Sequence, residues 1–332
     1  MPETAPLTPA ATPESPAATP LYVGVSTCLL GEPVRYDGGH KHDRYLTDVL
    51  GRFVRFVPVC PEVECGLGVP REAMRLVGDP AAPRLVTQKT NLDHTERMQA
   101  WAAGRVEELA GLDLCGFVFK SKSPSSGMER VKVYGENGHP VNKGVGLFAR
   151  AFMERFPLLP VEEEGRLNDV HLRENFIERL FLYKRWQDTV QRQRTMASLM
   201  EFHTRHKLLL MSHSQEKLRA LGKIVSDIGN ADVEAAIAAY FPLMMDAVAQ
   251  HATVKKQRNV LLHVMGYFKK HLDADEKQEL LEVVDRYAAG LAPLIVPVTL
   301  LNHYVRKYRQ PYLQAQWWLQ PHPVELALRN HA

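Results

Sequence analysis

Three short apolar segments in the first half of the chain each run into a polar turn. They cover residues 21–25, 53–59 and 114–120. Helical periodicity lies between the second and third segments, over residues 95–110, and after the third, over residues 144–156. Strands that alternate with helices are typical of a Rossmann-like parallel α/β sheet. Because the carboxyl ends of parallel strands meet at one edge of such a sheet, we expect the three polar turns to open on the same side.

The rest of the chain shows helical periodicity and little strand character. Residues 1–20 are rich in proline, alanine and threonine, which predicts a disordered tail before an α/β domain at residues 21–160. Residues 161–190 are interpreted as a linker and a helix, and residues 191–332 as an all-α domain. No apolar run approaches the roughly 18 residues of a membrane helix. The tail also lacks the basic segment of a signal peptide, so we expect a cytoplasmic protein.

Charge and nucleotide motifs exclude some function classes. The chain has 41 basic and 38 acidic residues and a net charge of +3, which is too even to indicate nucleic-acid binding without local clusters. It contains neither a GxGxxG nor a Walker motif, so the sequence gives no support to dinucleotide or ATP binding.

Two of the four cysteines follow predicted strands. Cys28 comes after the first apolar segment and Cys60 directly after the second. In a reducing compartment such thiols are metal ligands, catalytic groups or core residues more often than disulfides. The alternative for both is a buried thiol that acts as a small apolar side chain. Cys115 lies inside the third apolar segment, which favours the core.

Several motifs occur in an order that points to a family. The first half contains Ser-Thr-Cys-Leu-Leu-Gly, Cys-Pro-Glu, Pro-Arg-Glu and Ser-Pro-Ser-Ser-Gly, at residues 26–31, 60–62, 70–72 and 123–127. These segments resemble the thiouracil desulfidase family. The second half resembles the helical domain that is fused to such a domain in a tRNA 4-thiouridine desulfidase. The matching segments there are residues 202–207, 259–263, 266–270 and 311–313.

The resemblance implies an enzyme with a 4Fe–4S cluster that only three cysteines hold. The matching positions are Cys28, Cys60 and Ser126, and Ser126 is a departure because the family has cysteine there. Cys65 is the nearest other thiol that could replace it. An iron without a protein ligand would act as a Lewis acid toward a soft thiocarbonyl sulfur. Water would then attack C4 of the pyrimidine, and the sulfur would leave onto iron.

Two polar residues near these positions are candidates for proton transfer. Glu62, in the Cys-Pro-Glu motif, is expected to be the general base for the attacking water. The alternative is an ion pair with Arg71 or a loop cap. Ser123, on the opposing loop, could bind the substrate or relay a proton, or it could only satisfy the loop backbone. A structural role is expected for Glu64.

Basic and aromatic residues supply candidates for substrate binding. Arg35 and Tyr36, in a glycine-rich turn, and Lys120 and Lys122 could hold ribose or phosphate; the alternative is a solvated turn. In the second half, basic residues and tyrosines together suit phosphate contact and base stacking, although a charge run is also typical of a solvated helix face. The candidate RNA contacts are Lys255, Lys256, Arg258, His263, Lys269, Lys270, Arg306 and Lys307.

The sequence therefore predicts a desulfidase that removes sulfur from 4-thiouridine in tRNA. One alternative is a desulfidase for free thiopyrimidines or their nucleotides, with the helical domain as a lid or oligomerisation module. An alternative of another class is a non-catalytic RNA-binding or scaffold protein with a degenerate cluster site.

Overall fold

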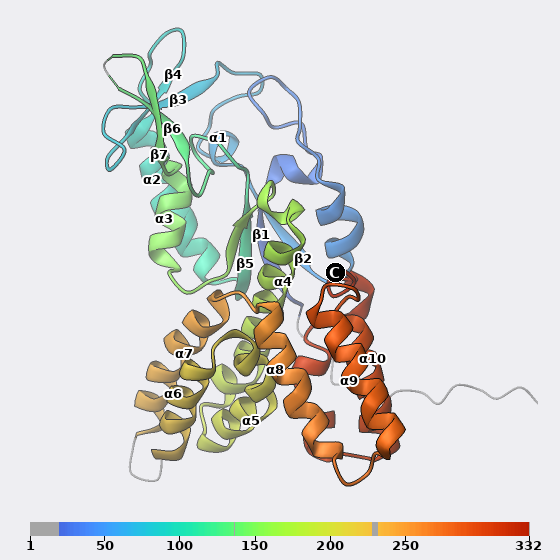
Figure 1. Ribbon diagram of the computed structural model, residues 1–332. Helices are drawn as coiled ribbons and strands as arrows, with labels where there is room; N and C mark the ends of the chain where they lie inside the picture. Colours follow the sequence, from blue (N-terminus) through green and yellow to red (C-terminus); the bar gives the residue numbers. More distant parts are fainter. Residues whose placement is uncertain (1–19, 136, 228–231, 332) are drawn as a thin grey trace, which may run out of the picture.

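The computed structural model describes residues 20–135, 137–227 and 232–331 (Figure 1). The predicted tail lies outside these ranges except for its last residue. Strands occur in the first half, and from α4 (Val170–Trp186) onward the described chain is helical. The predicted order, an α/β region followed by an all-α region, is thus confirmed.

Four parallel strands form the first sheet, which has the order β2-β1-β5-β8. They are β1 (Tyr22–Ser26), β2 (Arg55–Val59), β5 (Leu114–Phe119) and β8 (Val161–Glu163). Strands β1 and β5 occupy the centre, and both are almost entirely buried. The parallel sheet that the sequence predicted is therefore present, with one strand more than the three apolar segments indicated.

Helices cover both faces of this sheet. On one face, α2 (Thr95–Ala110) and α3 (Leu147–Arg155) pack against Phe117 and Phe119 of β5 (Figure 1). The opposite face is covered by α4 and by a short helical turn, Tyr45–Val49. The sheet is thus enclosed, as a parallel sheet must be, and only its edges and strand ends reach solvent.

The contact between β5 and α4 depends on Gly116. A Cβ atom at this position would lie 2.2 Å from Cδ2 of Leu180 and 2.7 Å from the carbonyl oxygen of Pro160. Only glycine therefore lets α4 approach the strand this closely.

Residues 161–190 join the two regions rather than separate them. The sequence predicted a linker at the start of this stretch, but residues 161–163 pair with β5 as an edge strand. The carboxylate of Asp169 then caps α4, because it accepts the backbone N–H of His171 at 2.9 Å and of Leu172 at 3.1 Å. Helix α4 contributes Phe176 to the core under the sheet and Trp186 to the core of the helical region.

The structure also contains a second sheet of four short strands, which none of the three apolar segments predicted. Its order is β4-β3-β6-β7, and β3 and β6 are parallel while the outer pairs are antiparallel. The strands are β3 (Met74–Val77), β4 (Arg84–Thr87), β6 (Val131–Tyr134) and β7 (Pro140–Gly144). Each has only four or five residues, and β7 is mostly exposed, so apolar alternation is weak.

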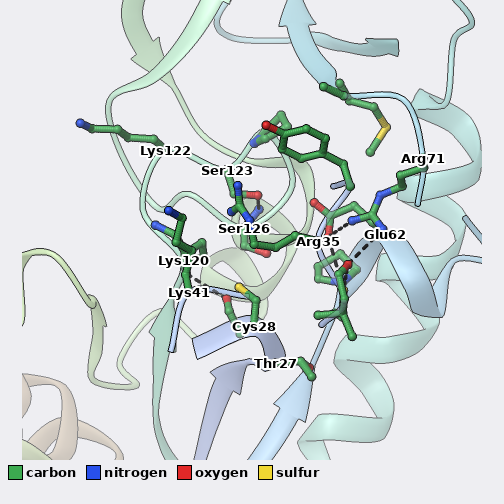
Figure 2. Close-up of a pocket in the computed structure, with 18 of the residues that line it drawn as sticks. Thr27, Cys28, Arg35, Lys41, Glu62, Arg71, Lys120, Lys122, Ser123 and Ser126 are labelled. Carbon is green, nitrogen blue, oxygen red and sulfur yellow. Dashed lines mark hydrogen bonds and ion pairs between the residues drawn. The ribbon is translucent and has the colours of Figure 1, made fainter. Parts of the chain in front are cut away.

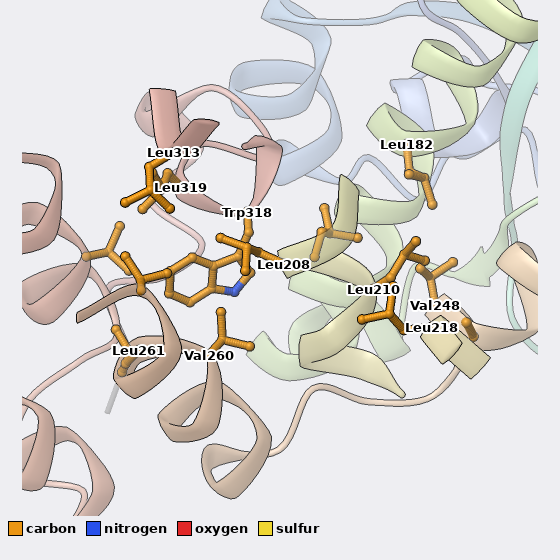
Figure 3. Close-up of a cluster of buried hydrophobic side chains, with 14 of the residues drawn as sticks. Leu182, Leu208, Leu210, Leu218, Val248, Val260, Leu261, Leu313, Trp318 and Leu319 are labelled. Atoms are coloured by element: carbon orange, nitrogen blue, oxygen red, sulfur yellow. The ribbon is translucent and has the colours of Figure 1, made fainter. Parts of the chain in front are cut away.

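The helical region is built around a large apolar core. Its helices are α5 (Met196–His213), α6 (Gln215–Ser226), α7 (Val233–Ala249), α8 (Val254–Met265), α9 (Ala274–Ala288), α10 (Ile295–Lys307) and α11 (Pro311–Gln314). The fully buried indole of Trp318 packs among Leu208, Val260 and Leu261, and its N–H donates to Oε1 of Gln257 at 2.9 Å (Figure 3). Pro297 lies in the first turn of α10, where no backbone donor is needed.

The last described residues return to the first sheet. Leu326 and Leu328 are buried in the core that also contains Val23 and Leu50. The α/β core is therefore completed by residues from the far end of the chain.

Candidate functional site

The loops that follow β1, β2 and β5 surround one cavity of about 430 Å³. Cys28, Cys60 and Ser126 all line it, each from a different loop. Figure 2 shows Lys41, Lys120 and Lys122 on one side of Cys28 and Ser126, and Glu62 and Arg71 on the other. The expectation that the three polar turns open on the same side is confirmed.

The two thiols in the cavity are nearly buried. Cys28 lies in the helical turn Thr27–Leu30, and Cys60 is the N-cap residue of α1 (Pro61–Glu64). Burial, with Glu62 as the next cause, raises the pKa of the Cys28 thiol to about 11 and that of the Cys60 thiol to about 12. Both groups are thus protonated thiols near neutral pH unless a metal displaces the proton.

The loop at 123–127 has a fixed conformation. Oγ of Ser123 accepts the backbone N–H of Ser125 at 3.3 Å and of Ser126 at 3.1 Å. A Cβ atom on Gly127 would lie 2.8 Å from the Ser123 carbonyl oxygen, so glycine is required for this tight turn. Ser123 therefore organises the loop that carries Ser126, in addition to lining the cavity.

Glu62 connects the loops across the cavity. Its Oε1 accepts the hydroxyl of Ser125 at 2.6 Å, and its Oε2 lies 3.7 Å from Sγ of Cys60 and 3.9 Å from Nη2 of Arg71. Both expected features, a carboxylate beside the thiols and an ion pair with Arg71, are therefore present in the same side chain.

Glu64 points to a different environment. It accepts the backbone N–H of Cys60 at 2.7 Å and forms an ion pair with Arg105 at 3.0 Å. Glu64 does not line the cavity. Its contacts are those of a residue that stabilises the start of α1.

The remaining cysteines are directed away from the cavity. The Cys65 thiol donates to the carbonyl oxygen of Glu62 at 3.3 Å and packs with Leu76 and Leu85 of the second sheet. The Cys115 thiol donates to Oε1 of Gln187 at 3.1 Å, inside the core. Cys65, which the sequence offered as a substitute for the third ligand, is thus not at the cavity in this structure, and Ser126 is.

Cations form one side of the cavity. Arg35, Tyr36, Lys120 and Lys122 line the cavity, and their binding of phosphate or ribose stays a prediction. Lys120 forms an ion pair with Glu164, so part of its charge is already balanced. Lys41 also lines the cavity, and sequence reasoning missed it although it follows the glycine-rich turn.

The second sheet also reaches the cavity. Met74 lies on β3, Gln88 follows β4, and both line the wall. No sequence signal pointed to these residues, because their position depends on a sheet that the pattern did not predict.

The basic residues of the helical region divide into two groups. Three of the predicted RNA contacts have protein partners: Nζ of Lys256 donates to the carbonyl oxygen of His213 at 2.6 Å, Arg258 pairs with Asp285 at 2.8 Å and Lys307 with Glu276 at 2.9 Å. The others are exposed, with no carboxylate of the described chain within 4.0 Å: Lys255, His263, Lys269, Lys270 and Arg306.

Comparisons with known proteins relate the first half of the chain to enzymes. Residues 23–164 match the family model of 2-thiouracil desulfurase. A solved structure of the [4Fe-4S]-dependent thiouracil desulfidase TudS is 30% identical, covers 45% of this chain and 94% of that chain, and has a TM-score of 0.36. Residues 23–164 thus form a domain of the thiouracil desulfidase family. The motifs from which the resemblance was drawn thus identify the family correctly.

The second half of this desulfidase-family chain matches another model. Residues 207–323 match the model named "Protein of unknown function (DUF1722)". The Escherichia coli (strain K12) protein described as "Uncharacterized protein YbgA" is 32% identical over 137 residues, which are 41% of this chain and 81% of that protein. The two family models follow each other along the chain, in agreement with a desulfidase domain joined to a helical domain.

The donor set at the strand ends is unlike that of an ordinary metal site. Among the described residues, no group of three or more His, Cys, Asp or Glu side chains is arranged to hold a metal ion. The strand ends instead provide two thiols and one serine hydroxyl.

None of the helices in the described part of the chain is both long and apolar enough to cross a membrane.

Proposed function

We propose that this protein removes sulfur from a thiolated pyrimidine, with 4-thiouridine in tRNA as the substrate. The observation that carries this proposal is the convergence of Cys28, Cys60, Ser126 and Glu62 on one cavity. It occurs in the domain of the thiouracil desulfidase family, in which TudS is described as [4Fe-4S]-dependent.

The donor set suits a cluster held at three corners. Cys28 and Cys60 would provide thiolates, and Ser126 would provide an oxygen in place of the family's third cysteine. Iron–sulfur clusters tolerate ligands other than cysteine, although serine oxygen is a harder donor. When bound, a cluster with one iron free of protein ligands supplies a Lewis acid for the thiocarbonyl sulfur.

The chain's own residues would position the substrate and move the proton. Glu62 would accept a proton from the water that attacks C4, because its carboxylate lies beside the Cys60 thiol. The ion pair with Arg71 and the hydroxyl of Ser125 would hold that carboxylate in place. Ser123 would keep the loop at 123–127 closed around the reacting base.

The cationic side of the cavity would hold the sugar and phosphate. Arg35, Lys41 and Lys122 lie there, where a nucleotide's phosphate would meet positive charge. In the helical region, the exposed Lys255, Lys269 and Lys270 would contact the tRNA backbone.

The test is an anaerobic reconstitution with iron and sulfide, followed by incubation with tRNA that contains 4-thiouridine. We expect about four irons per chain, release of sulfide and loss of the thiolated nucleoside from the tRNA. An iron-free protein that still binds tRNA would contradict the proposal and support the scaffold alternative. Turnover of a free thiopyrimidine nucleotide, with no activity on tRNA, would support the other desulfidase alternative.

A charge-reversal variant distinguishes activity on tRNA from activity on a free thiopyrimidine nucleotide. The triple variant Lys255→Glu, Lys269→Glu and Lys270→Glu should lower activity on tRNA at least tenfold, and the wild-type affinity for tRNA should fall steeply with salt. Activity on a thiopyrimidine nucleotide should be unchanged. Equal loss on both substrates would contradict a role of these lysines in RNA binding.

A further inference from the structure

A second cavity, of about 540 Å³, lies in the helical region. Its wall is formed by α5, α10 and the segment that follows α11, and none of the residues that line the first cavity takes part. Arg205, Arg306 and Arg329 line it, whereas no aspartate or glutamate is among the residues that do. The charged side chains that line the cavity are therefore all cations.

Arg185 lies behind this wall, and its guanidinium has no direct ion pair with a carboxylate of the described chain. Its Nη1 donates to the carbonyl oxygen of Pro321 at 2.8 Å, and its guanidinium carbon lies 4.4 Å from the ring centroid of Trp317. Both of those residues line the cavity. The buried Nη2 of Arg185 has no hydrogen-bond partner, and no carboxylate of the described chain lies within 4.0 Å of it.

A buried guanidinium without a counter-ion is unfavourable unless an anion balances it. Burial lowers the pKa of Arg185 to about 9, so the group is still charged at neutral pH. An anion in the cavity would therefore meet a positive charge on which Glu178 acts only from beyond ion-pair distance.

The three arginines that line the cavity differ in how far their charge is balanced. Arg306, on α10, is exposed and has no carboxylate within ion-pair distance in the described ranges. Arg205 has a partner in Glu201 at 3.3 Å, but both side chains of this pair are exposed and the pair is accordingly weak. Arg329, by contrast, is buried and paired with Glu174 at 3.3 Å. Arg205 and Arg306 are therefore the lining residues that can turn to a ligand.

His322 adds an unused hydrogen-bond acceptor to the same cavity. It is 6% exposed, and its Nδ1 lies 3.2 Å from the carbonyl oxygen of Pro323. A carbonyl oxygen only accepts, so Nδ1 carries the hydrogen and Nε2 presents a lone pair. This Nε2 is buried and has no partner. Burial lowers the pKa of His322 to about 4, so the ring is neutral and keeps this lone pair near pH 7.

The remaining lining groups suit a planar polar molecule. Trp317, Asn302, Gln314 and Gln320 line the cavity. Cations, neutral hydrogen-bonding groups and an aromatic ring in one acid-free cavity match a ligand with a phosphate and a heterocyclic base. The lone pair of His322 matches an amino, N–H or hydroxyl donor of that ligand.

We propose that this cavity binds one phosphate-bearing nucleotide, with the phosphate at Arg205 and Arg306 and a base or ribose donor at Nε2 of His322. The nucleotide comes either from the free pool or from an RNA strand. Binding here does not depend on the desulfidase reaction, since the two cavities share no residue.

The experiment is calorimetric titration of the full chain with four probes: uridine monophosphate, uridine, inorganic phosphate and a short single-stranded RNA. Arg205→Gln and Arg306→Gln should each weaken binding of the monophosphate at least tenfold. Arg219→Gln, an exposed arginine on α6 that does not line the cavity, is the matched control and should change nothing. Uridine should bind at least tenfold more weakly than its monophosphate.

The titration with single-stranded RNA shows whether the nucleotide is free or part of a strand. If the RNA binds at least tenfold more tightly than the monophosphate, and Arg205→Gln and Arg306→Gln remove this difference in affinity, the site binds a nucleotide within an RNA strand. Equal affinities for the RNA and the monophosphate indicate that the ligand is the free nucleotide. Either result supports the site. Binding that Arg205→Gln and Arg306→Gln leave unchanged, or binding of inorganic phosphate as tight as that of the monophosphate, would overturn it. The Cys28→Ser chain, which should lack desulfidase activity, should still bind, so failure of one proposal is distinguishable from failure of the other.

Discussion

The two cavities differ in the chemistry of their walls. The first lies at the ends of three parallel strands and combines thiols, a carboxylate and cations. The second lies among helices and combines arginines with neutral groups, without a carboxylate. A wall that holds a carboxylate and soft ligands suits a reaction, whereas a wall of arginines and neutral hydrogen-bonding groups suits the binding of an anion. If both proposals hold, the chain separates reaction from recognition.

The largest effect is expected from the thiols of the first cavity. Cys28→Ser or Cys60→Ser should lower bound iron to background and desulfidase activity at least a hundredfold, because thiolates are the main cluster ligands. Cys65→Ser is the matched control, since this thiol packs against the second sheet and does not line the cavity. Iron analysis and sulfide release measure both. Loss of iron in the Cys65→Ser chain alone would show that the ligands are assigned wrongly.

The second-largest loss of activity is expected from removal of the Glu62 carboxylate. Glu62→Gln keeps the size of the side chain but removes the base, so kcat should fall about 10²- to 10⁴-fold, the usual range for general-base catalysis. Iron content should stay the same. Glu64→Gln should have little effect, because glutamine can still accept the backbone N–H of Cys60. Comparable losses in the two variants would place the base elsewhere.

Acid should destabilise the helical region. Burial lowers the pKa of His203 and of His322 to about 4, well below the ordinary value near 6.5. Between those two pH values the unfolded chain binds protons that the folded chain does not, so the free energy of unfolding falls as the pH is lowered. Each histidine accounts for up to about 3 kcal/mol, at about 1.4 kcal/mol per pKa unit.

One group opposes this trend. Burial raises the pKa of Glu174 to about 7, so its protonation adds stability as the pH falls from 7 toward 4.5. Burial also lowers the pKa of His206 well below its ordinary value, so three histidines oppose one glutamate, and a net loss of at least about 3 kcal/mol is expected between pH 6.5 and 4. Urea unfolding followed by tryptophan fluorescence measures it, since Trp186, Trp317 and Trp318 all lie in or beside the helical core. A free energy of unfolding that is constant over this range would contradict the prediction.

The smallest expected effect is an increase in bound iron. Ser126→Cys places a third thiol at the cavity and should raise the iron retained after purification in air about twofold, because thiolate is a softer ligand for iron than serine oxygen. Binding of uridine monophosphate to the second cavity should not change. An unaltered iron content would argue against Ser126 as a ligand position.

Much of the first cavity could be predicted from sequence because it follows from strand ends. Cys28, Cys60 and Ser126 are far apart in the chain, but each follows a recognisable apolar segment, and parallel pairing brings such ends together. The contribution of Met74 and Gln88 could not be predicted, since it depends on strands too short to show a pattern.

The second cavity could not be predicted from sequence at all. Arg205 and His322 are brought together by helix packing, which leaves no periodic signal for a shared ligand. The pattern of basic residues also did not predict which of them are free to bind RNA, because the sequence does not show which basic side chains form ion pairs or hydrogen bonds within the protein. Arg258, for example, pairs with Asp285 of the neighbouring α9, and Lys256 holds backbone carbonyls in place.

The return of Leu326 and Leu328 to the core of the first sheet bears on biosynthesis. The nascent chain exposes the strands β1 and β2 long before these leucines leave the ribosome. One face of the sheet therefore lacks part of its apolar packing until they are synthesised. Until then the desulfidase domain has an incomplete core, and the cysteines above it sit on an unfinished support. Cofactor insertion would accordingly follow release of the whole polypeptide rather than accompany translation of its first half.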